Sequence, residues 1–197
     1  MLDKEIIRRI PKVELHEHLD GGLRPETIIE LARERNVTIP STDPVELKEW
    51  FKRGCIQKSL TLYLETFSVT LSVMQDKEAL YRIAKEEILD LAKEHVVYAE
   101  IRFAPELHTK KGLNLEEVVT AVLKGLEAGR KETGTEFGLI LSAMRNEDPS
   151  ISLEVAELAV AFSDRGVVGF DLAGDECGHP PKKHIEAFNY IRSKNFN

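Results

Sequence analysis

Apolar and polar residues alternate along residues 11–22, which is the pattern of a β-strand whose two faces have different surroundings. One face carries Glu14, His16, His18 and Asp20, and the other carries Val13, Leu15 and Leu19. We expect the apolar face to pack against a layer of helices and the polar face to bind a ligand. Gly21 and Gly22 end the strand and let the backbone approach that ligand closely.

The rest of the chain alternates between helical periodicity and short apolar runs. Helices are predicted over residues 3–10, 25–36, 45–53, 59–74, 76–95, 114–134, 152–165 and 181–194. Near-continuous apolar runs at residues 96–104, 137–144 and 167–173 predict strands that are covered on both faces. Strands that alternate with helices in this way indicate right-handed βαβ units and a parallel sheet.

This order of elements predicts a single α/β domain over residues 1–197. A complete (β/α)8 barrel needs about 250 residues. The chain therefore supplies about the first four βα units of such a barrel, or it forms a smaller fold. Residues 40–75 are predicted to be a helical, lid-like insertion after the first strand, because long insertions at the top of a barrel often cover the site.

Composition narrows the class of partner. Apolar residues make up 42% of the chain and charged residues 31%, and the net charge of −7 without a basic block argues against a nucleic-acid partner. Cys55 and Cys177 lie far apart and form no metal-type pair, which fits a reduced, cytoplasmic setting. The N-terminus has no apolar signal segment, and no apolar run approaches the roughly 20 residues of a membrane span, so no membrane partner is expected.

The two histidines of the first strand form a candidate metal site. Side chains at positions i and i+2 of a strand share a face, so His16 and His18 can direct two nitrogens at one ion. Zinc takes such ligands at about 2.0–2.1 Å. The alternative is a surface strand with ordinary polar residues. Asp20 at the next alternate position, followed by two glycines, favours the metal site.

Polar residues also follow the other predicted strands, at the edge where parallel α/β folds place their sites: Arg102, Glu106, Arg145, Asp171 and Asp175. Glu100 and Arg102 share one face of the second strand and must be paired if they are buried. A structural ion network inside the barrel is the favoured interpretation, and a direct catalytic role is the alternative. His184 is expected on the surface of a helix.

Two segments resemble the adenosine deaminase family. Residues 11–28, PKVELHEHLDGGLRPETI, resemble the opening of that family, whose first barrel strand carries His-x-His-x-Asp-Gly. Residues 169–176, GFDLAGDE, resemble the segment in which the family carries Gly-Asp-Glu. The resemblance extends over nearly the whole chain, and it implies a (β/α)8 barrel.

The resemblance also implies an activity and its residues. The family deaminates adenosine to inosine and ammonia by means of a zinc-bound hydroxide. His16 and His18 would bind Zn²⁺, with His18 also beside the substrate; Asp20 would accept a ribose hydroxyl, and the N–H of Gly174 would contact the purine ring. A helical gate would place Leu60, Tyr63, Leu64 and Phe67 against the nucleoside, although plain helix packing is the alternative for each of them.

Part of the family's site has no counterpart in this sequence. The family's third histidine ligand and the glutamate that protonates the ring lie in a fifth-strand His-Ala-Gly-Glu motif, which would fall downstream of Asn197. We therefore expect no catalytic residue within this chain and expect the chain to be inactive alone. The alternatives are a deaminase of free adenine or another 6-aminopurine, another metallohydrolase of this barrel group, and a non-catalytic zinc-binding half-barrel that self-associates through its open edges.

Overall fold

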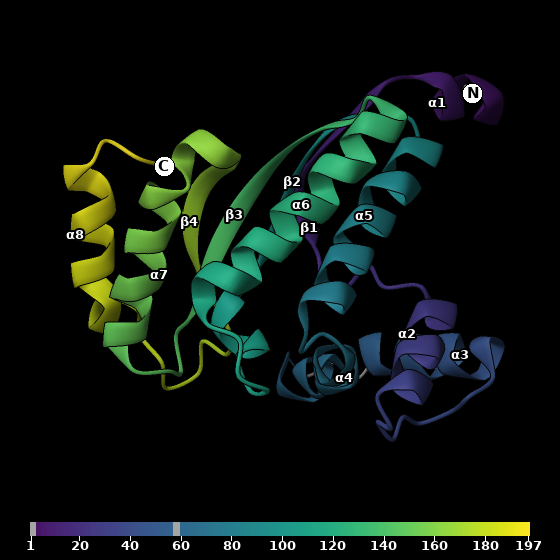
Figure 1. The fold of residues 1–197 in the computed structure, drawn as a ribbon, viewed down its shortest axis with the longest axis horizontal. Helices are drawn as coiled ribbons and strands as arrows, with labels where there is room; N and C mark the ends of the chain where they lie inside the picture. Colours follow the sequence, from purple (N-terminus) through teal and green to yellow (C-terminus); the bar gives the residue numbers. More distant parts are fainter. Residues whose placement is uncertain (1–2, 57–59) are drawn as a thin grey trace.

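Four parallel strands form the sheet that organises the molecule (Figure 1). The computed structural model describes residues 3–56 and 60–197. The strands β1 (Lys12–His18), β2 (Val96–Phe103), β3 (Glu136–Met144) and β4 (Val167–Ala173) lie side by side in chain order, and each neighbouring pair is parallel. The predicted α/β class is confirmed, and this strand order is what the first four units of a parallel barrel provide.

Helices connect the strands in the predicted order. The helix α1 (Lys4–Arg9) precedes β1, and α2 (Pro25–Glu34), α3 (Pro44–Cys55), α4 (Leu60–Val73) and α5 (Lys77–Lys93) lie between β1 and β2. The later helices are α6 (Leu115–Thr133), α7 (Pro149–Ala161) and α8 (Ile185–Ser193). Short 3-10 helices occur at Pro105–His108, Ser163–Arg165 and Pro181–His184. The helix α7 begins three residues before its predicted start because Asp148 caps it and Pro149 occupies its first turn.

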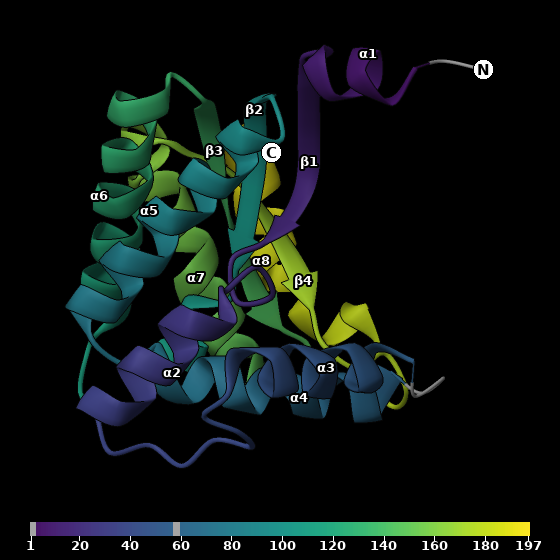
Figure 2. The same ribbon diagram turned by 90° about the vertical axis from the view of Figure 1, so that its right-hand side faces the viewer.

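The helices form two groups around the sheet. The crossover helices α5, α6 and α7 pack against β2, β3 and β4, so they cover one face of the sheet. The helices α2, α3 and α4 instead lie together across the end toward which β1 points (Figure 2). This end holds the C-terminal ends of all four parallel strands, where the sequence predicts the site.

Caps and apolar stripes explain where the crossover helices form. The side chain of Asp76 accepts a hydrogen bond from the backbone N–H of Ala79 at the start of α5. Asn114 and Glu117 form a reciprocal capping box on α6, which ends at Gly134 with φ of +80°. The buried core between these helices and the sheet includes Ile83, Ala84, Ile88, Val118, Val122, Leu126, Ile101, Leu139, Leu141, Val155 and Ala159.

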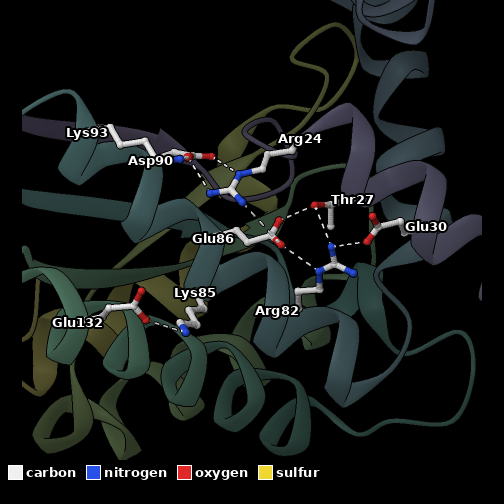
Figure 3. Close-up of polar contacts among 9 residues, drawn as sticks. All are labelled: Arg24, Thr27, Glu30, Arg82, Lys85, Glu86, Asp90, Lys93 and Glu132. Atoms are coloured by element: carbon white, nitrogen blue, oxygen red, sulfur yellow. Dashed lines mark hydrogen bonds and ion pairs between the residues drawn. The ribbon is translucent and has the colours of Figure 1, made fainter. Parts of the chain in front are cut away.

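A network of charged side chains attaches α2 to α5 (Figure 3). The guanidinium of Arg24 donates two hydrogen bonds to the carboxylate of Asp90, at 2.6 and 2.7 Å. The hydroxyl of Thr27 donates to Glu86, which also accepts a 2.9 Å bond from Arg82. Because Arg24 directly precedes α2, this network fixes the segment that runs from the end of β1 into the helical group at the site.

The first strand differs from its prediction in two ways. It ends at His18, so Asp20 lies in the turn beyond the strand and not on its polar face. Val13 and Leu15 are 56% and 57% exposed, so the predicted helix layer does not cover them. The reason is that the crossover helices pack on β2, β3 and β4 and leave the edge strand β1 uncovered on this side. Leu19, which follows the strand, is fully buried.

Among the described residues, no helix combines the length and the apolar character that a membrane span requires. This finding concerns residues 3–56 and 60–197, and the expectation that the protein has no membrane partner rests on the sequence.

Close packing between α5 and α6 gives the first testable prediction. A Cβ atom on Gly125 would collide with the carbonyl oxygen of Tyr81 and lie 2.8 Å from the Cβ of Ala84. Gly125→Ala should therefore reduce the free energy of unfolding by about 1–3 kcal/mol, although alanine favours helices. Urea unfolding of the variant and of Lys124→Ala, an exposed position on the same helix, tests this. Equal stabilities of the two variants would contradict the packing.

Candidate functional site

A cavity of about 780 Å³ lies at the C-terminal ends of the strands. All four strands contribute to its wall, and side chains of α4 line it from the other side. The lining includes His16, His18, Asp20, Tyr63, Leu64, Phe67, Arg102, Ser142, Met144, Arg145, Asp171 and Gly174. The structure therefore brings most of the predicted strand-end residues, but not Glu106, to one cavity together with the predicted gate residues Tyr63, Leu64 and Phe67.

His16 and His18 direct their imidazoles at one point. The Nη1 atom of Arg102 lies 3.1 Å from Nε2 of His16 and 3.0 Å from Nε2 of His18. The two rings are 5.1 Å apart between centroids. Because one nitrogen contacts both Nε2 atoms, the two imidazoles converge as the spacing of the histidines predicts.

Arg102 is held from its other side by β4. Its Nη2 atom lies 2.6 Å from Oδ2 of Asp171, and the arginine side chain is only 8% exposed. The register places Arg102 beside His18 on β1, so its guanidinium reaches from the first strand across β3 to the fourth. The predicted pairing of Arg102 with neighbouring strands is thus present. Glu100 takes a different partner, accepting a 3.1 Å hydrogen bond from the Tyr98 hydroxyl.

Asp20 is buried in the turn after β1, with 8% of its surface exposed. Its Oδ1 atom lies 3.8 Å from Nδ1 of His18, and it has no hydrogen-bond partner within the described chain. Asp20 also lines a second cavity of about 620 Å³ between α2, α3 and α4, together with Tyr63 and Phe67. A buried carboxylate oxygen that lacks a partner, on a residue that lines two cavities, is suited to accept a hydrogen bond from a ligand.

The helix α4 supplies an aromatic wall to the cavity. The rings of Tyr63 and Phe67 contact edge to face at 5.3 Å, and Phe67 lies 6.4 Å from the ring of His18. Leu64 lines the same cavity. The side chain of Leu60, the fourth predicted gate residue, lies outside the part of the chain that the structure describes.

Gly174 lies at the rim of the cavity, directly after β4. Its φ is +97°, and a Cβ atom there would lie 3.0 Å from Oδ1 of Asn146 and 3.1 Å from Cε of Met144. Both features favour glycine at this position. Glycine is therefore required by the backbone conformation and by the close approach of Asn146 and Met144, and the contact of Gly174 with a ligand stays a prediction.

One histidine prediction is wrong. His184 is fully buried, because it lies in a 3-10 helix that packs on α7 and not on an exposed helix face. The Nδ1 atom of His184 lies 2.6 Å from the Ser152 hydroxyl, and its Nε2 atom lies 3.1 Å from the carbonyl oxygen of Arg145. His184 therefore holds the end of β3 from behind and does not face the cavity.

Sequence reasoning also missed Ser142 and Met144 as lining residues. Both belong to an apolar strand run, which predicts a strand but does not indicate which of its side chains face a ligand. Alternation along the strand is a usable signal, because Ser142 and Met144 lie two residues apart and so share a face.

The donors of the cavity partly fit a metal ion. Imidazole nitrogens suit zinc, and the point on which His16 and His18 converge is taken by a cationic nitrogen of Arg102. In the described part of the chain, however, no group of three or more histidine, cysteine, aspartate or glutamate side chains is arranged to hold a metal. His16 and His18 would supply two zinc ligands, fewer than the three that catalytic zinc usually takes from protein.

A buried carboxyl group supports the turn that follows β1. Glu87 on α5 is 7% exposed, and its carboxyl group packs against Gly22, where a Cβ atom would overlap it. Burial, and secondarily the nearby charge of Glu17, raises the pKa of Glu87 to about 8. At neutral pH this side chain is therefore largely protonated, and it fills the space that Gly22 leaves.

Comparisons with known proteins place the chain in context. A family model described as adenosine deaminase matches residues 11–197. The adenosine deaminase of Mycobacterium ulcerans is 50% identical over 197 residues, which cover 97% of this chain and 54% of the relative. Likewise, the adenosine deaminase 1 of Streptomyces coelicolor is 52% identical, over 96% of this chain and 49% of the relative's length. The chain thus spans about half the length of the curated relatives it matches.

Solved structures agree in fold. Arabidopsis ADAL complexed with GMP superposes with a TM-score of 0.83 at 28% identity, over 98% of this chain and 58% of ADAL. A zinc-bound amidohydrolase from Burkholderia ambifaria superposes with a TM-score of 0.85 at 23% identity, over 100% of this chain and 54% of the amidohydrolase chain. At this identity the second likeness concerns the fold alone.

The raised pKa of Glu87 gives a prediction for stability. The folded protein retains a proton that the unfolded chain releases above about pH 4.5, so this group's contribution to stability is lost as the pH rises toward 8. Glu87→Gln cannot ionise. Relative to the unsubstituted protein, the variant should gain roughly 2–4 kcal/mol of unfolding free energy between pH 5 and pH 8.5.

Urea unfolding across this pH range measures the effect. Glu78→Gln serves as the control, because Glu78 lies exposed on the same helix. A relative stability of Glu87→Gln that stays constant with pH would show that Glu87 is already ionised in the folded protein.

Proposed function

The chain belongs to the adenosine deaminase family, and from this premise we propose that it contributes part of an active site that hydrolyses adenosine or deoxyadenosine to ammonia and inosine or deoxyinosine. Water adds to the carbon that bears the amino group, and the amino group leaves as ammonia. The observation that carries the proposal is the convergence of His16 and His18 at the cavity which Asp20 and Gly174 also line.

The predicted metal-binding and substrate-binding residues of the cavity have roles that their positions support. His16 and His18 would hold a zinc ion through Nε2. Zinc, when bound, supplies a hydroxide nucleophile near neutral pH. The free Oδ1 of Asp20 would accept a ribose hydroxyl, and the N–H of Gly174 would donate to the purine ring.

The insertion over residues 40–75 would act as a lid over the nucleoside. Within it, α4 supplies the aromatic wall formed by Tyr63 and Phe67, and Leu64 extends that wall. Apolar side chains in this position would pack on the base and exclude bulk water from the reaction.

The remaining zinc ligands and the acid that protonates the ring would come from a segment beyond these 197 residues. This is supported by the two-histidine set within the described chain and by relatives that are about twice as long. On this proposal the 197 residues supply the substrate contacts and the first two zinc ligands. The chain alone does not turn over adenosine.

Charge at the cavity favours a nucleoside over a nucleoside monophosphate. Both described arginines of the lining are paired, Arg102 with Asp171 at 2.6 Å and Arg145 with Glu176 at 3.5 Å. Paired guanidinium groups are poorly placed to bind a phosphate as well. The carboxylate of Asp20 instead suits a hydroxyl, which also favours a nucleoside over free adenine.

A non-catalytic zinc-binding half-barrel is the second candidate. The exposed Val13 and Leu15 on the β1 edge favour it, because exposed apolar edge strands promote self-association.

A cytoplasmic location remains a prediction from the cysteine content.

The metal site is tested by replacing both histidines. The 197-residue protein should bind one Zn²⁺ weakly in isothermal titration calorimetry, and the doubly substituted protein, with His16→Ala and His18→Ala, should lose this binding. His95→Asn is the control, because His95 is exposed and has a φ of +59° that asparagine tolerates. Equal zinc binding by all three proteins would place the metal elsewhere. In the same preparations, conversion of adenosine to inosine with zinc present would contradict the proposed need for further residues.

The purine contact is tested at Gly174. Gly174→Ala should weaken adenosine binding roughly tenfold or more, because the added methyl group meets Asn146 and Met144 at the cavity rim. Gly178→Ala is the matched control, since Gly178 has a φ of +77° but open space around its Cβ position. Adenosine affinity is measured by chemical-shift titration. Similar losses in both variants would mean that backbone strain alone, and not the cavity rim, is responsible.

A further inference from the structure

Arg102 makes contacts that an ordinary structural ion pair does not require. Its Nη1 atom lies within 3.1 Å of both ligand nitrogens of the histidine pair, and its Nη2 atom lies 2.6 Å from Asp171. The residue is 7% exposed. One guanidinium therefore joins the two candidate zinc ligands on β1 to a carboxylate on β4.

The chemistry of these contacts fixes the histidine tautomers. An arginine side chain carries only donors and stays protonated in proteins. Both Nε2 atoms must therefore accept, which leaves the proton of each neutral ring on Nδ1. For His18 this agrees with the position of Asp20, whose Oδ1 atom lies 3.8 Å from Nδ1. The Nε2 lone pairs that would bind a metal are thus already formed and directed at one point.

The same contacts place Nη1 where a metal would compete with it. A zinc ion bound by both imidazoles lies about 2.0–2.1 Å from each Nε2, so it cannot coexist with a nitrogen that lies 3.1 Å and 3.0 Å from the same two atoms. Asp171 can keep its contact with the guanidinium when Nη1 is displaced, because this contact is made to Nη2. Its second oxygen, Oδ1, is buried and has no partner in the described chain, so it is free to accept Nη1.

We propose that Arg102 is a positioning residue that holds His16 and His18 in the metal-binding tautomer and occupies the cation position until a divalent metal displaces its Nη1 atom onto Asp171. This inference rests on the proposed function. It predicts opposite effects for the two partners of one ion pair. Loss of Arg102 removes a competitor for the histidines, and loss of the Asp171 charge removes the group that receives the displaced guanidinium.

The tautomers are tested first, without metal. Imidazole nitrogen chemical shifts of the metal-free 197-residue protein should show unprotonated Nε2 on both histidines. In Arg102→Gln the two tautomers should become mixed, and Arg102→Lys should restore at most one of them, because a single ammonium lacks the planar fork. Predominant Nε2–H in the unsubstituted protein would overturn the proposal, and so would unchanged tautomers in Arg102→Gln.

Metal affinity is tested next by titration with Zn²⁺ or Co²⁺ alone. Asp171→Asn should bind the metal roughly tenfold weaker, the size of loss that removing a partner of metal ligands usually causes. Arg102→Gln should bind it more tightly, because the competing cation is gone. Arg35→Gln is the control, because it breaks another arginine–carboxylate pair, with Asp76, far from the histidines along the chain. Thermal unfolding of each variant shows whether it has folded.

The outcomes separate the inference from the proposed function. If the unsubstituted protein binds no metal, the proposed zinc site fails and the competition fails with it, while the tautomer result still confirms or overturns the positioning role. If metal binds but both variants weaken it equally, Arg102 and Asp171 form only a structural pair and the inference is wrong. Opposite shifts in the two variants confirm it.

Discussion

The parallel alignment of four strands is the constraint on which the whole site depends. Because neighbouring strands run in the same direction, their C-terminal ends meet at one edge, and residues separated by more than 150 positions in the chain become neighbours there. His18 ends β1, and Asp171 lies on β4, yet Arg102 on β2 contacts both. The crossover helices that make this alignment possible pack on one face of the sheet, which leaves the other face and the C-terminal edge free for chemistry.

Burying ionisable groups at this edge requires partners or a change of protonation. Arg102 has a carboxylate and two imidazoles, and Asp171 has Arg102. Glu106 instead shows a change in its protonation equilibrium. Burial raises its pKa to about 7, while one of its oxygens accepts a 2.8 Å hydrogen bond from the backbone of Met144 at the end of β3. The edge is therefore held by charged pairs on the cavity side and, behind it, by a carboxyl group whose pKa is raised.

The two faces of β1 differ in their surroundings: one carries the histidine pair of the cavity, and the other is exposed. Its inward residues, His16 and His18, have partners at the cavity, whereas its outward residues, Val13 and Leu15, are exposed. In a parallel barrel both kinds of position are covered, the first by the interior and the second by the outer helices. The same edge strand therefore carries both the histidine pair of the proposed metal site and an exposed apolar surface.

The sequence alone determined the α/β class, the four strands, nearly all of the helices and the identity of the histidine pair. These are local properties, since periodicity, caps such as Asp76 and Asn114, and the His-x-His spacing are all written in short segments. Only the tertiary structure decided that Asp20 lies beyond the strand, that His184 is buried, and that Arg102 contacts both histidines. Those facts depend on register, on helix packing and on side chains that reach across strands, which no local pattern encodes.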